Sequence, residues 1–244
     1  MEIFSGKKAV SRGIAHFGYH GISVDIEEDL RHDFSTTHGF LLCLRALLVM
    51  KAGSLLFMAP PCGTWVWVSR GSTQRSVERP EGMGSACTEQ ANALVTRMTY
   101  LAVLASALGI HVVIEQPASS ILWNMVPVQR MLKYISARST KADMGAYGAP
   151  TRKGLVFKGD LPGLERLEKK VDKFDREAMA LENPPPTTTS VVGTDGKKRA
   201  SGGPGLKDSA EYPLGFGAAI GLIFHTTYEG TYKHQEPAWT LEFS

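Results

Sequence analysis

The stretch Leu55-Leu56-Phe57-Met58-Ala59-Pro60-Pro61-Cys62-Gly63-Thr64-Trp65 joins an apolar run of strand length to two consecutive prolines. Because proline cannot donate a backbone hydrogen bond to a neighbouring strand, we expect the strand to end before Pro60. Cys62 follows at once, at the carboxyl end of what we expect to be a buried parallel strand. Ligands of open α/β sheets gather beyond that end, which places this thiol for chemistry. A packed core position is the alternative, since free cysteines are often buried.

The first 26 residues predict a strand–helix–strand unit. Residues 2–6 read as a short strand that ends at Gly6, residues 7–17 have helical spacing, and residues 22–26 read as a second strand. Asp25, near the end of the second strand, suits the hydroxyl pair of a ribose, and the amino end of the helix suits a charged ligand group. A full GxGxxG motif is missing, so a plain strand–helix turn is the alternative.

The segment over residues 65–82 is polar and irregular. Such length without regular structure is typical of a functional lid or of disorder. Arg70, Arg75 and Arg79 suit contacts with phosphate, although a solvated loop is the plainer interpretation.

A carboxylate is expected on the same sheet edge as Cys62. After a predicted apolar helix over residues 91–108, residues 110–114 form a buried strand, and Glu115 follows directly. A thiol and a carboxyl group on one edge suit nucleophilic attack with general acid assistance. The alternatives for Glu115 are a cap for a helix or a solvated strand end.

From about residue 161 the sequence becomes more polar. The elements that we expect around it are a strand over residues 155–157, a surface helix over 164–179, a stiff linker over 183–189, a mobile basic loop over 193–206, a helix from 209 through 223 and a polar tail from 226. The basic loop contains Lys197, Lys198 and Arg199, which are candidate phosphate contacts or simply solvated charges.

Composition places the chain among globular proteins. Its 244 residues suit one large α/β domain with a small appendage, and 43% hydrophobic with 21% charged residues is ordinary for such a domain. A net charge of +3 permits an anionic partner without arguing for one. Three scattered cysteines indicate neither a disulfide framework nor zinc, so we expect no metal and a reducing, intracellular setting, nuclear or cytoplasmic. Neither a signal peptide nor an apolar run of membrane-spanning length is apparent, so we expect a soluble protein without membrane contact.

The order of these motifs resembles the DNA (cytosine-5) methyltransferase family. The cofactor motifs of that family are similar to Phe4-Ser5-Gly6, Asp25-Ile26 and Asp33-Phe34. Pro61-Cys62 is similar to the Pro-Cys motif of that family, and Glu115-Gln116-Pro117 is similar to its Glu-Asn-Val motif. The stretch Tyr147-Gly148-Ala149-Pro150-Thr151-Arg152 is similar to its Tyr-Gly-x-Pro-Gln-x-Arg motif, and residues 212–223 are similar to its closing helix.

The resemblance covers roughly residues 1–160 and 209–224. It implies a Rossmann-like S-adenosylmethionine-dependent methyltransferase fold, with a mostly parallel sheet and helices on both faces. It divides the chain into a catalytic, cofactor-binding domain over 1–160, a small insert or linker over 161–206 in place of a target-recognition domain, and residues 207–244. These last residues would hold a C-terminal helix that packs back on the catalytic domain, followed by a tail.

The same resemblance implies methylation of cytosine C5 in DNA, with RNA as the alternative substrate. Cys62 would attack C6 of the base, Glu115 would act at N3, and Arg152 would steady the base carbonyl or a flanking phosphate. The residues implied in cofactor binding are Phe4, Ser5, Gly6, Asp25, Ile26, Asp33, Phe34 and Pro60. The residues implied in nucleic-acid binding are Arg70, Arg75, Lys197, Lys198 and Arg199.

Several departures from the family pattern leave alternatives open. Gly63 follows the cysteine where Gln is usual, Gln116 replaces Asn, and Thr151 replaces Gln. The insert over 161–206 is too short for a full recognition domain, which leaves room for a partner protein that supplies target recognition. One alternative is a catalytically inactive relative that binds nucleic acid. Another is a Rossmann-type methyltransferase with a different substrate, although Ala59 and Cys62 do not fit the Asp/Asn-Pro-Pro-aromatic turn of amino-methyltransferases.

Overall fold

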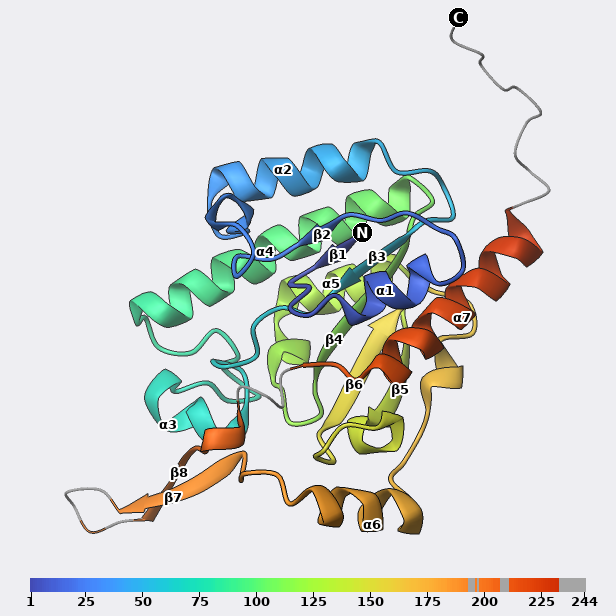
Figure 1. Ribbon diagram of the computed structural model, residues 1–244. Helices are drawn as coiled ribbons and strands as arrows, with labels where there is room; N and C mark the ends of the chain where they lie inside the picture. Colours follow the sequence, from blue (N-terminus) through green and yellow to red (C-terminus); the bar gives the residue numbers. More distant parts are fainter. Residues whose placement is uncertain (193–195, 197, 207–210, 233–244) are drawn as a thin grey trace, which may run out of the picture.

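The computed structural model describes residues 1–192, 196, 198–206 and 211–232. Its centre is a six-stranded sheet with the order β2-β1-β3-β4-β6-β5 (Figure 1). The strands are β1 (Glu2–Ile3), β2 (Ser23–Val24), β3 (Leu55–Met58), β4 (His111–Pro117), β5 (Arg138–Asp143) and β6 (Gly154–Gly159). Strands β1 to β4 pair with one another in parallel, whereas β6 is antiparallel to both β4 and β5. The prediction of an α/β fold with a mostly parallel sheet is confirmed.

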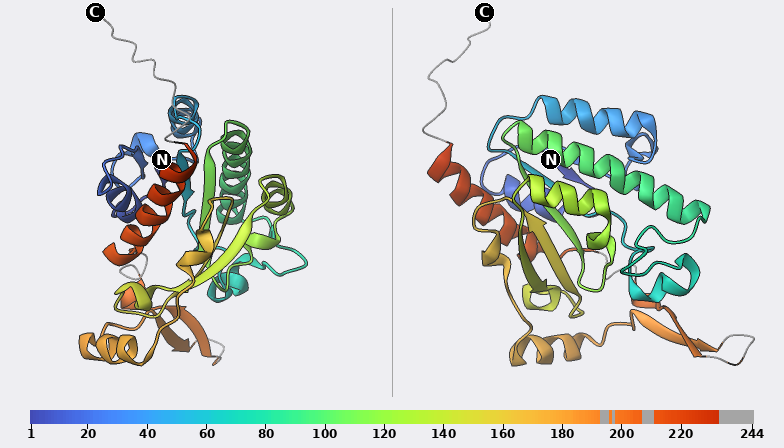
Figure 2. Two further views of the ribbon diagram at one scale, coloured as in Figure 1. Left: turned by 90° about the vertical axis from the view of Figure 1, so that its right-hand side faces the viewer. Right: turned by 180° about the vertical axis from the view of Figure 1, so that it is seen from behind.

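Helices cover both faces of this sheet (Figure 2). Leu56 and Met58 of β3 point into one apolar core, and Leu55 and Phe57 point into the other, as expected from the alternation of side chains along a strand. The first core is covered by α2 (Thr37–Leu48), α4 (Ala86–Ala107) and α5 (Val126–Tyr134), and the second by α1 (Ala9–Ala15) and α7 (Leu214–Thr231). Burial on both faces explains why β3 reads as one continuous apolar run.

The first and last helices, α1 and α7, pack in close contact through glycine. A Cβ added at Gly217 would lie 2.0 Å from the carbonyl oxygen of Ala9, and one added at Gly13 would lie 1.8 Å from that of Gly217. Helix α7 extends further than the sequence predicted, because Phe224 and Tyr228 prolong its apolar stripe over the same core. The expectation of a polar tail from residue 226 is therefore wrong as far as Thr231.

Two predictions for the insert are also wrong. Instead of one helix over 164–179, the chain forms the 3-10 turn η5 (Leu164–Leu167) and the separate helix α6 (Lys173–Glu182), because the two leucines of the turn are buried in the core. The basic loop expected over 193–206 contributes the strand β8 (Lys198–Gly202) and the 3-10 turn η6 (Pro204–Leu206). Strand β8 pairs with β7 (Thr188–Val192) in an antiparallel hairpin.

Other elements differ from the sequence prediction near the ends of the sheet. The prediction omits β5, an edge strand whose side chains at Arg138, Ser139 and Lys141 are exposed and polar. Residues 65–82 are not wholly irregular, since they contain the 3-10 turn η2 (Trp67–Ser69) and the short helix α3 (Arg70–Thr73). Helix α4 begins earlier than expected, because the side chain of Ser85 caps it by accepting a hydrogen bond from the backbone of Thr88. The remaining 3-10 turns are η1 (Leu30–His32), η3 (Leu122–Asn124) and η4 (Met144–Tyr147).

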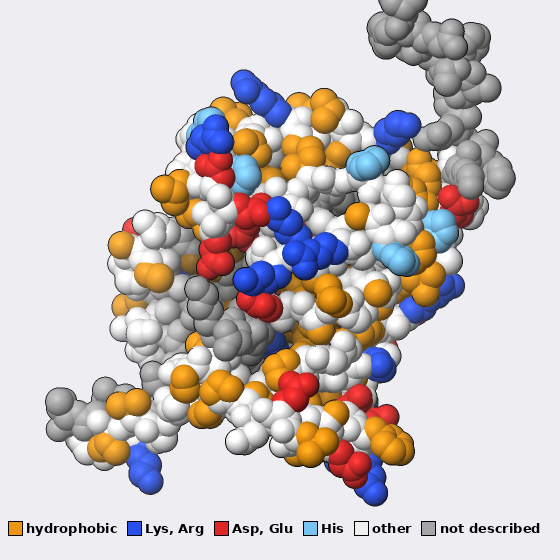
Figure 3. Space-filling model, viewed as in Figure 1, with side chains coloured by type: hydrophobic (Ala, Val, Ile, Leu, Met, Phe, Trp, Pro, Cys, Tyr) orange, Lys and Arg blue, Asp and Glu red, His pale blue; other side chains and the backbone are white. Residues whose placement is uncertain are grey.

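The surface around α1 carries charges of both signs. Acidic and basic side chains lie intermixed near the centre of the face shown in Figure 3, and the ion pairs Lys7–Glu211 and Lys8–Glu28 belong to this region. None of the described helices combines the length and the apolar character that a membrane span requires.

Candidate active site

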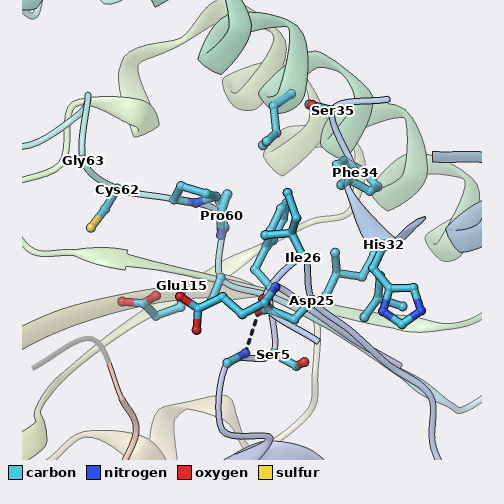
Figure 4. Close-up of a pocket in the computed structure, with 18 of the residues that line it drawn as sticks. Ser5, Asp25, Ile26, His32, Phe34, Ser35, Pro60, Cys62, Gly63 and Glu115 are labelled. Carbon is cyan, nitrogen blue, oxygen red and sulfur yellow. Dashed lines mark hydrogen bonds between the residues drawn. The ribbon is translucent and has the colours of Figure 1, made fainter. Parts of the chain in front are cut away.

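A pocket of about 680 Å³ opens at the carboxyl ends of the parallel strands. Strand β1 has β2 on one side and β3 on the other, so the strand order reverses at this point, where ligands of open α/β sheets bind. Figure 4 shows Cys62 and Glu115 at one end of the pocket, and His32 and Phe34 at the other. The volume lies within the range of pockets that hold a small ligand or cofactor.

The turn after β1 forms the floor of the pocket. Phe4 has a φ of +62°, a left-handed conformation that is costly for an aromatic residue, and Gly6 has a φ of +47°. This turn directs the backbone nitrogen of Gly6 at the Asp25 carboxylate, which it reaches at 2.7 Å (Figure 4). The other Asp25 oxygen accepts a hydrogen bond from the backbone nitrogen of Glu27 at 2.8 Å. The carboxylate is thus held in place and keeps free lone pairs for a ligand.

An apolar wall closes the end of the pocket opposite Cys62. Phe34 is buried and packs edge-to-face on Phe4, with 5.4 Å between the ring centroids. The loop before α2 is held by Asp33, whose carboxylate accepts from the backbone nitrogen of Ser35 at 2.8 Å, and by Arg97, which donates to the carbonyl oxygen of Phe34 at 3.2 Å. This wall suits the flat apolar face of a heterocycle.

The loop that carries Cys62 is held from the neighbouring strand β4. Gln116 is fully buried, and its amide nitrogen donates to the carbonyl oxygen of Pro60 at 2.6 Å. Its amide oxygen accepts from the hydroxyl of Ser120 at 2.9 Å. On the far side of Cys62, the backbone nitrogen of Trp65 donates to the Cys62 carbonyl at 2.9 Å. The turn that presents the thiol is therefore fixed on both sides.

Glu115 is the buried acid of the site, with 5% of its surface exposed. Its Oε2 accepts a hydrogen bond from the hydroxyl of Tyr212 at 2.7 Å, and its Oε1 is buried without a partner among the described residues. Burial raises the pKa of this carboxyl group, against the opposing effects of the Lys153 charge and the Tyr212 hydrogen bond. The carboxyl group therefore stays protonated to a higher pH than an exposed one, and in that form it can act as a hydrogen-bond donor.

The cation that acts on Glu115 and Cys62 is Lys153 rather than Arg152. Lys153 lines the pocket and is close enough to influence the charges of both Glu115 and Cys62. Arg152 is 73% exposed, and its Nε donates to Asp143 at 3.0 Å instead. The expectation that Arg152 belongs to the catalytic group does not fit this arrangement, because the chain before β6 turns at Lys153, whose φ is +20°, and the Arg152 side chain pairs with Asp143.

The Cys62 thiol is partly buried at the rim of the pocket. Its pKa is raised, first by burial and then by the nearby Glu115, while Lys153 lowers it. The free protein thus keeps the thiol mainly protonated, and a positive charge at Lys153 favours the thiolate. Cys43 differs, since it packs in the core, where burial raises its pKa to about 12.

Arg75 does not reach the surface, so the expectation that it contacts phosphate is wrong for this structure. The guanidinium stacks on the Trp65 ring at 3.5 Å from the centroid, and its nitrogens donate to Asn92 at 2.9 Å and to the Thr88 carbonyl at 3.3 Å. Burial lowers the pKa of Arg75 to about 10. Its role is to fold residues 65–82 against α4.

The other expected nucleic-acid contacts are only partly placed. Arg70 is exposed at the start of α3, and Lys198 is exposed in the hairpin. Lys197 lies outside the described residues, as does the side chain of Arg199. Of the residues whose side chains the structure describes, neither Arg70 nor Lys198 lines the pocket itself.

The structure brings together every residue that the sequence implied in cofactor binding, because all of them line the pocket. It adds residues that sequence reasoning missed, and these are Tyr212, Lys153, His32, and Cys87 and Gln90 at the start of α4. Lys153 stood beside the selected arginine in the sequence, whereas no signal connected Tyr212 with Glu115. Among the described residues, no three His, Cys, Asp or Glu side chains converge closely enough to hold a metal ion.

Comparison with known protein families, and with curated proteins, gives no match for this sequence. The interpretation of the site therefore depends on its own geometry and chemistry.

Proposed function

We propose that this protein methylates C5 of cytosine in a nucleic acid, with DNA as the first candidate, through a covalent bond between Cys62 and C6 of the base. One observation carries the proposal. A thiol and a buried carboxyl group share one end of a pocket whose other end carries a fixed carboxylate and an aromatic wall (Figure 4). The first end suits attack on an electron-poor ring, and the second suits a nucleoside.

The second end fits the nucleoside of S-adenosylmethionine. Asp25 keeps free lone pairs for the two ribose hydroxyls, and Phe34, Ile26 and Pro60 offer apolar surface to the adenine. Ser5 adds a buried hydroxyl that has no partner among the described residues. When bound, this cofactor would supply an electrophilic methyl group.

The chain's own residues would activate the base. C5 of cytosine is a weak nucleophile, and addition of the Cys62 thiolate to C6 makes it carbanion-like. The protonated Glu115 would donate to N3 and so stabilise the charge that develops on the ring. Lys153 would favour the thiolate form of Cys62. After C5 has gained its methyl group, loss of the C5 proton restores the double bond and expels the thiolate.

The target must enter the pocket as an unpaired base. A cytosine inside a duplex presents neither C6 nor N3 to the end of a pocket, so the base has to be flipped out or already single-stranded. The segment 65–82 lies beside Cys62 and would cover the base. A partner protein would add the recognition surface that the short insert lacks.

The test uses oligonucleotide pools that contain 5-fluorocytosine, in DNA and in RNA form, with S-adenosylmethionine. Fluorine at C5 cannot leave as a proton would, so the enzyme should remain covalently bound to the strand. We expect a denaturation-resistant adduct that maps to Cys62 by mass spectrometry, is absent in Cys62→Ser and persists in Cys87→Ser. Adduct formation by Cys62→Ser would show that the nucleophile is a different residue.

The departures from the family pattern and the short insert leave one alternative, a non-catalytic protein that binds nucleic acid in the same pocket. The same experiment separates the two. Binding of cofactor and nucleic acid without any adduct, in either pool, would support the alternative.

A further inference from the structure

Tyr212 reaches the acid of the site from a distant part of the chain. Its hydroxyl donates to Oε2 of Glu115 at 2.7 Å, although the two residues are 97 positions apart. Tyr212 lies just before α7, and it lines the same pocket as Cys62 and Glu115. The contact therefore joins the C-terminal helix to the chemical end of the pocket.

The ring of Tyr212 is held firmly enough to orient its hydroxyl. It packs against Phe216 with 4.9 Å between centroids, and edge-to-face against Phe57 with 6.1 Å. Burial and the nearby Glu115 raise the pKa of Tyr212 well above its usual value, so the hydroxyl stays protonated and remains able to donate. Tyr212 therefore continues to donate a hydrogen bond to one of the two carboxyl oxygens of Glu115.

That donor makes the two oxygens of Glu115 different. Oε2 accepts the Tyr212 hydrogen bond, whereas the buried Oε1 has no partner among the described residues. A proton that binds the carboxylate therefore finds its free lone pairs on Oε1. Without the tyrosine hydroxyl, either oxygen could carry the proton, and part of the protein would hold it on Oε2.

We propose that Tyr212 is a positioning residue that directs the proton of Glu115 to Oε1, from which it can be donated to a ring nitrogen in the pocket. The identity of that nitrogen rests on the proposed function. The contact between Tyr212 and Glu115 is seen in the structure whatever the substrate is. Tyr212 acts through Glu115, and no contact with the substrate is required of it.

The groups around Glu115 determine the expected pH dependence. Lys153 comes from the start of β6, Cys62 from the loop after β3, and Glu2 of β1 lies close enough to influence Tyr212. Glu211 is exposed and pairs with Lys7. Since a hydrogen bond to a carboxylate stabilises its charged form, the Tyr212 hydroxyl lowers the pKa of Glu115, and its removal must raise that pKa further.

The test measures the protonation of Glu115 directly and then through the reaction. In Tyr212→Phe, we expect a carboxyl ¹³C NMR titration of Glu115, assigned with Glu115→Gln, to shift upward by about one pH unit. The pH profile of adduct formation with 5-fluorocytosine DNA should move in the same direction, and the maximal rate of that profile should fall by about twofold, because part of the protein then holds the proton on Oε2. The matched control is Tyr147→Phe, because Tyr147 contacts the same Phe216 ring but donates to the Leu167 carbonyl at 2.9 Å.

An unchanged titration of Glu115 in Tyr212→Phe, or an equal shift in Tyr147→Phe, would overturn the inference. If Tyr212→Phe does not fold, replacement of tyrosine by 3-fluorotyrosine provides a stronger donor in an intact ring and should lower the pKa of Glu115; a pKa that stays constant would contradict us. A wild-type protein that forms no adduct would overturn the proposed function alone, since the NMR titration still decides the role of Tyr212.

Discussion

Glu115 couples the chemistry of the pocket to the stability of the protein. Its pKa is raised in the folded protein above the ordinary value of 4.5, so the folded state binds the proton more tightly than the unfolded chain. The stabilisation is complete below about pH 4.5 and is lost as the pH rises through the folded pKa.

Glu115→Gln should remove the loss of stability at rising pH, since the amide does not ionise. Its oxygen can still accept the hydrogen bond from Tyr212. The difference in free energy of unfolding between the variant and the wild type should be constant in acid. Between the unfolded and the folded pKa of Glu115, it should then shift in favour of the variant by up to about 1.4 kcal/mol per pH unit. Urea unfolding of both proteins at a series of pH values measures this difference. The pKa of Glu2 is also raised, but Glu2 is present in both proteins, so its contribution cancels. A constant difference at all pH values would mean that folding leaves the pKa of Glu115 unchanged.

Two adjacent cations test the electrostatics of the thiol. Lys153→Gln should raise the pKa of Cys62 and slow its alkylation by iodoacetamide about threefold at pH 8, because a positive charge that favours the thiolate is lost. Arg152→Gln is the matched control, since this side chain is exposed and pairs with Asp143. Both variants are made in a Cys87→Ser background, because Cys87 is also exposed. Equal slowing by both substitutions would show that net charge, and not position, controls the thiol.

At the residue level, the sequence could predict the convergence of Cys62 and Glu115 because both follow parallel strands, whose carboxyl ends share one edge. It could not choose between Arg152 and Lys153, since that choice depends on the direction of the chain entering β6. It could not predict the burial of Arg75 either, because the Trp65 ring and the start of α4 that enclose the guanidinium are brought together only by folding.

The paired helices α1 and α7 give a sharp test at the level of elements. Gly217→Ala should lower the free energy of unfolding by about 1–3 kcal/mol, because the new methyl group would lie 2.0 Å from the Ala9 carbonyl oxygen and push the helices apart. Gly230→Ala, in the same helix, meets nothing within 4 Å and should be neutral or stabilising by up to about 1 kcal/mol. Chemical denaturation of both variants measures the difference, and an equal response would mean that the glycine contact is loose.

Elements with a strong apolar pattern were predictable, and polar ones were not. Strands β3 and β4 are buried on both faces and read clearly as apolar runs. Strand β5 lies at an edge, and the hairpin strand β7 is largely exposed, so neither needs an apolar sequence. The buried leucines of η5 had helical spacing, which explains why the sequence indicated one long helix there.

The hairpin of β7 and β8 provides a test at the level of the whole molecule. Thr187 and Gly203 lie side by side, with 2.9 Å between the Gly203 nitrogen and the Thr187 carbonyl oxygen, so a short Gly-Ser link can replace Thr188–Gly202. Because the described hairpin side chains are mostly exposed, the thermal midpoint should change by less than about 3 °C. Binding of nucleic acid should weaken by about tenfold, since basic residues are removed.

Lys198→Gln removes one positive charge and leaves the hairpin intact. It therefore distinguishes the effect of lost charge from the effect of a missing hairpin in that experiment. Fluorescence anisotropy at two salt concentrations measures both variants, and full binding by the shortened protein would exclude the hairpin from the interface.

The close contact of α1 with α7 also determines the order in which this protein can become folded. The core on that side of the sheet combines Val10, near the start of the chain, with Phe216 and Ile220, near its end. A growing chain on the ribosome therefore holds an uncovered apolar face until its last helix has been synthesised. Such long-range closure is slow, because distant parts of the chain have to meet before this core can form.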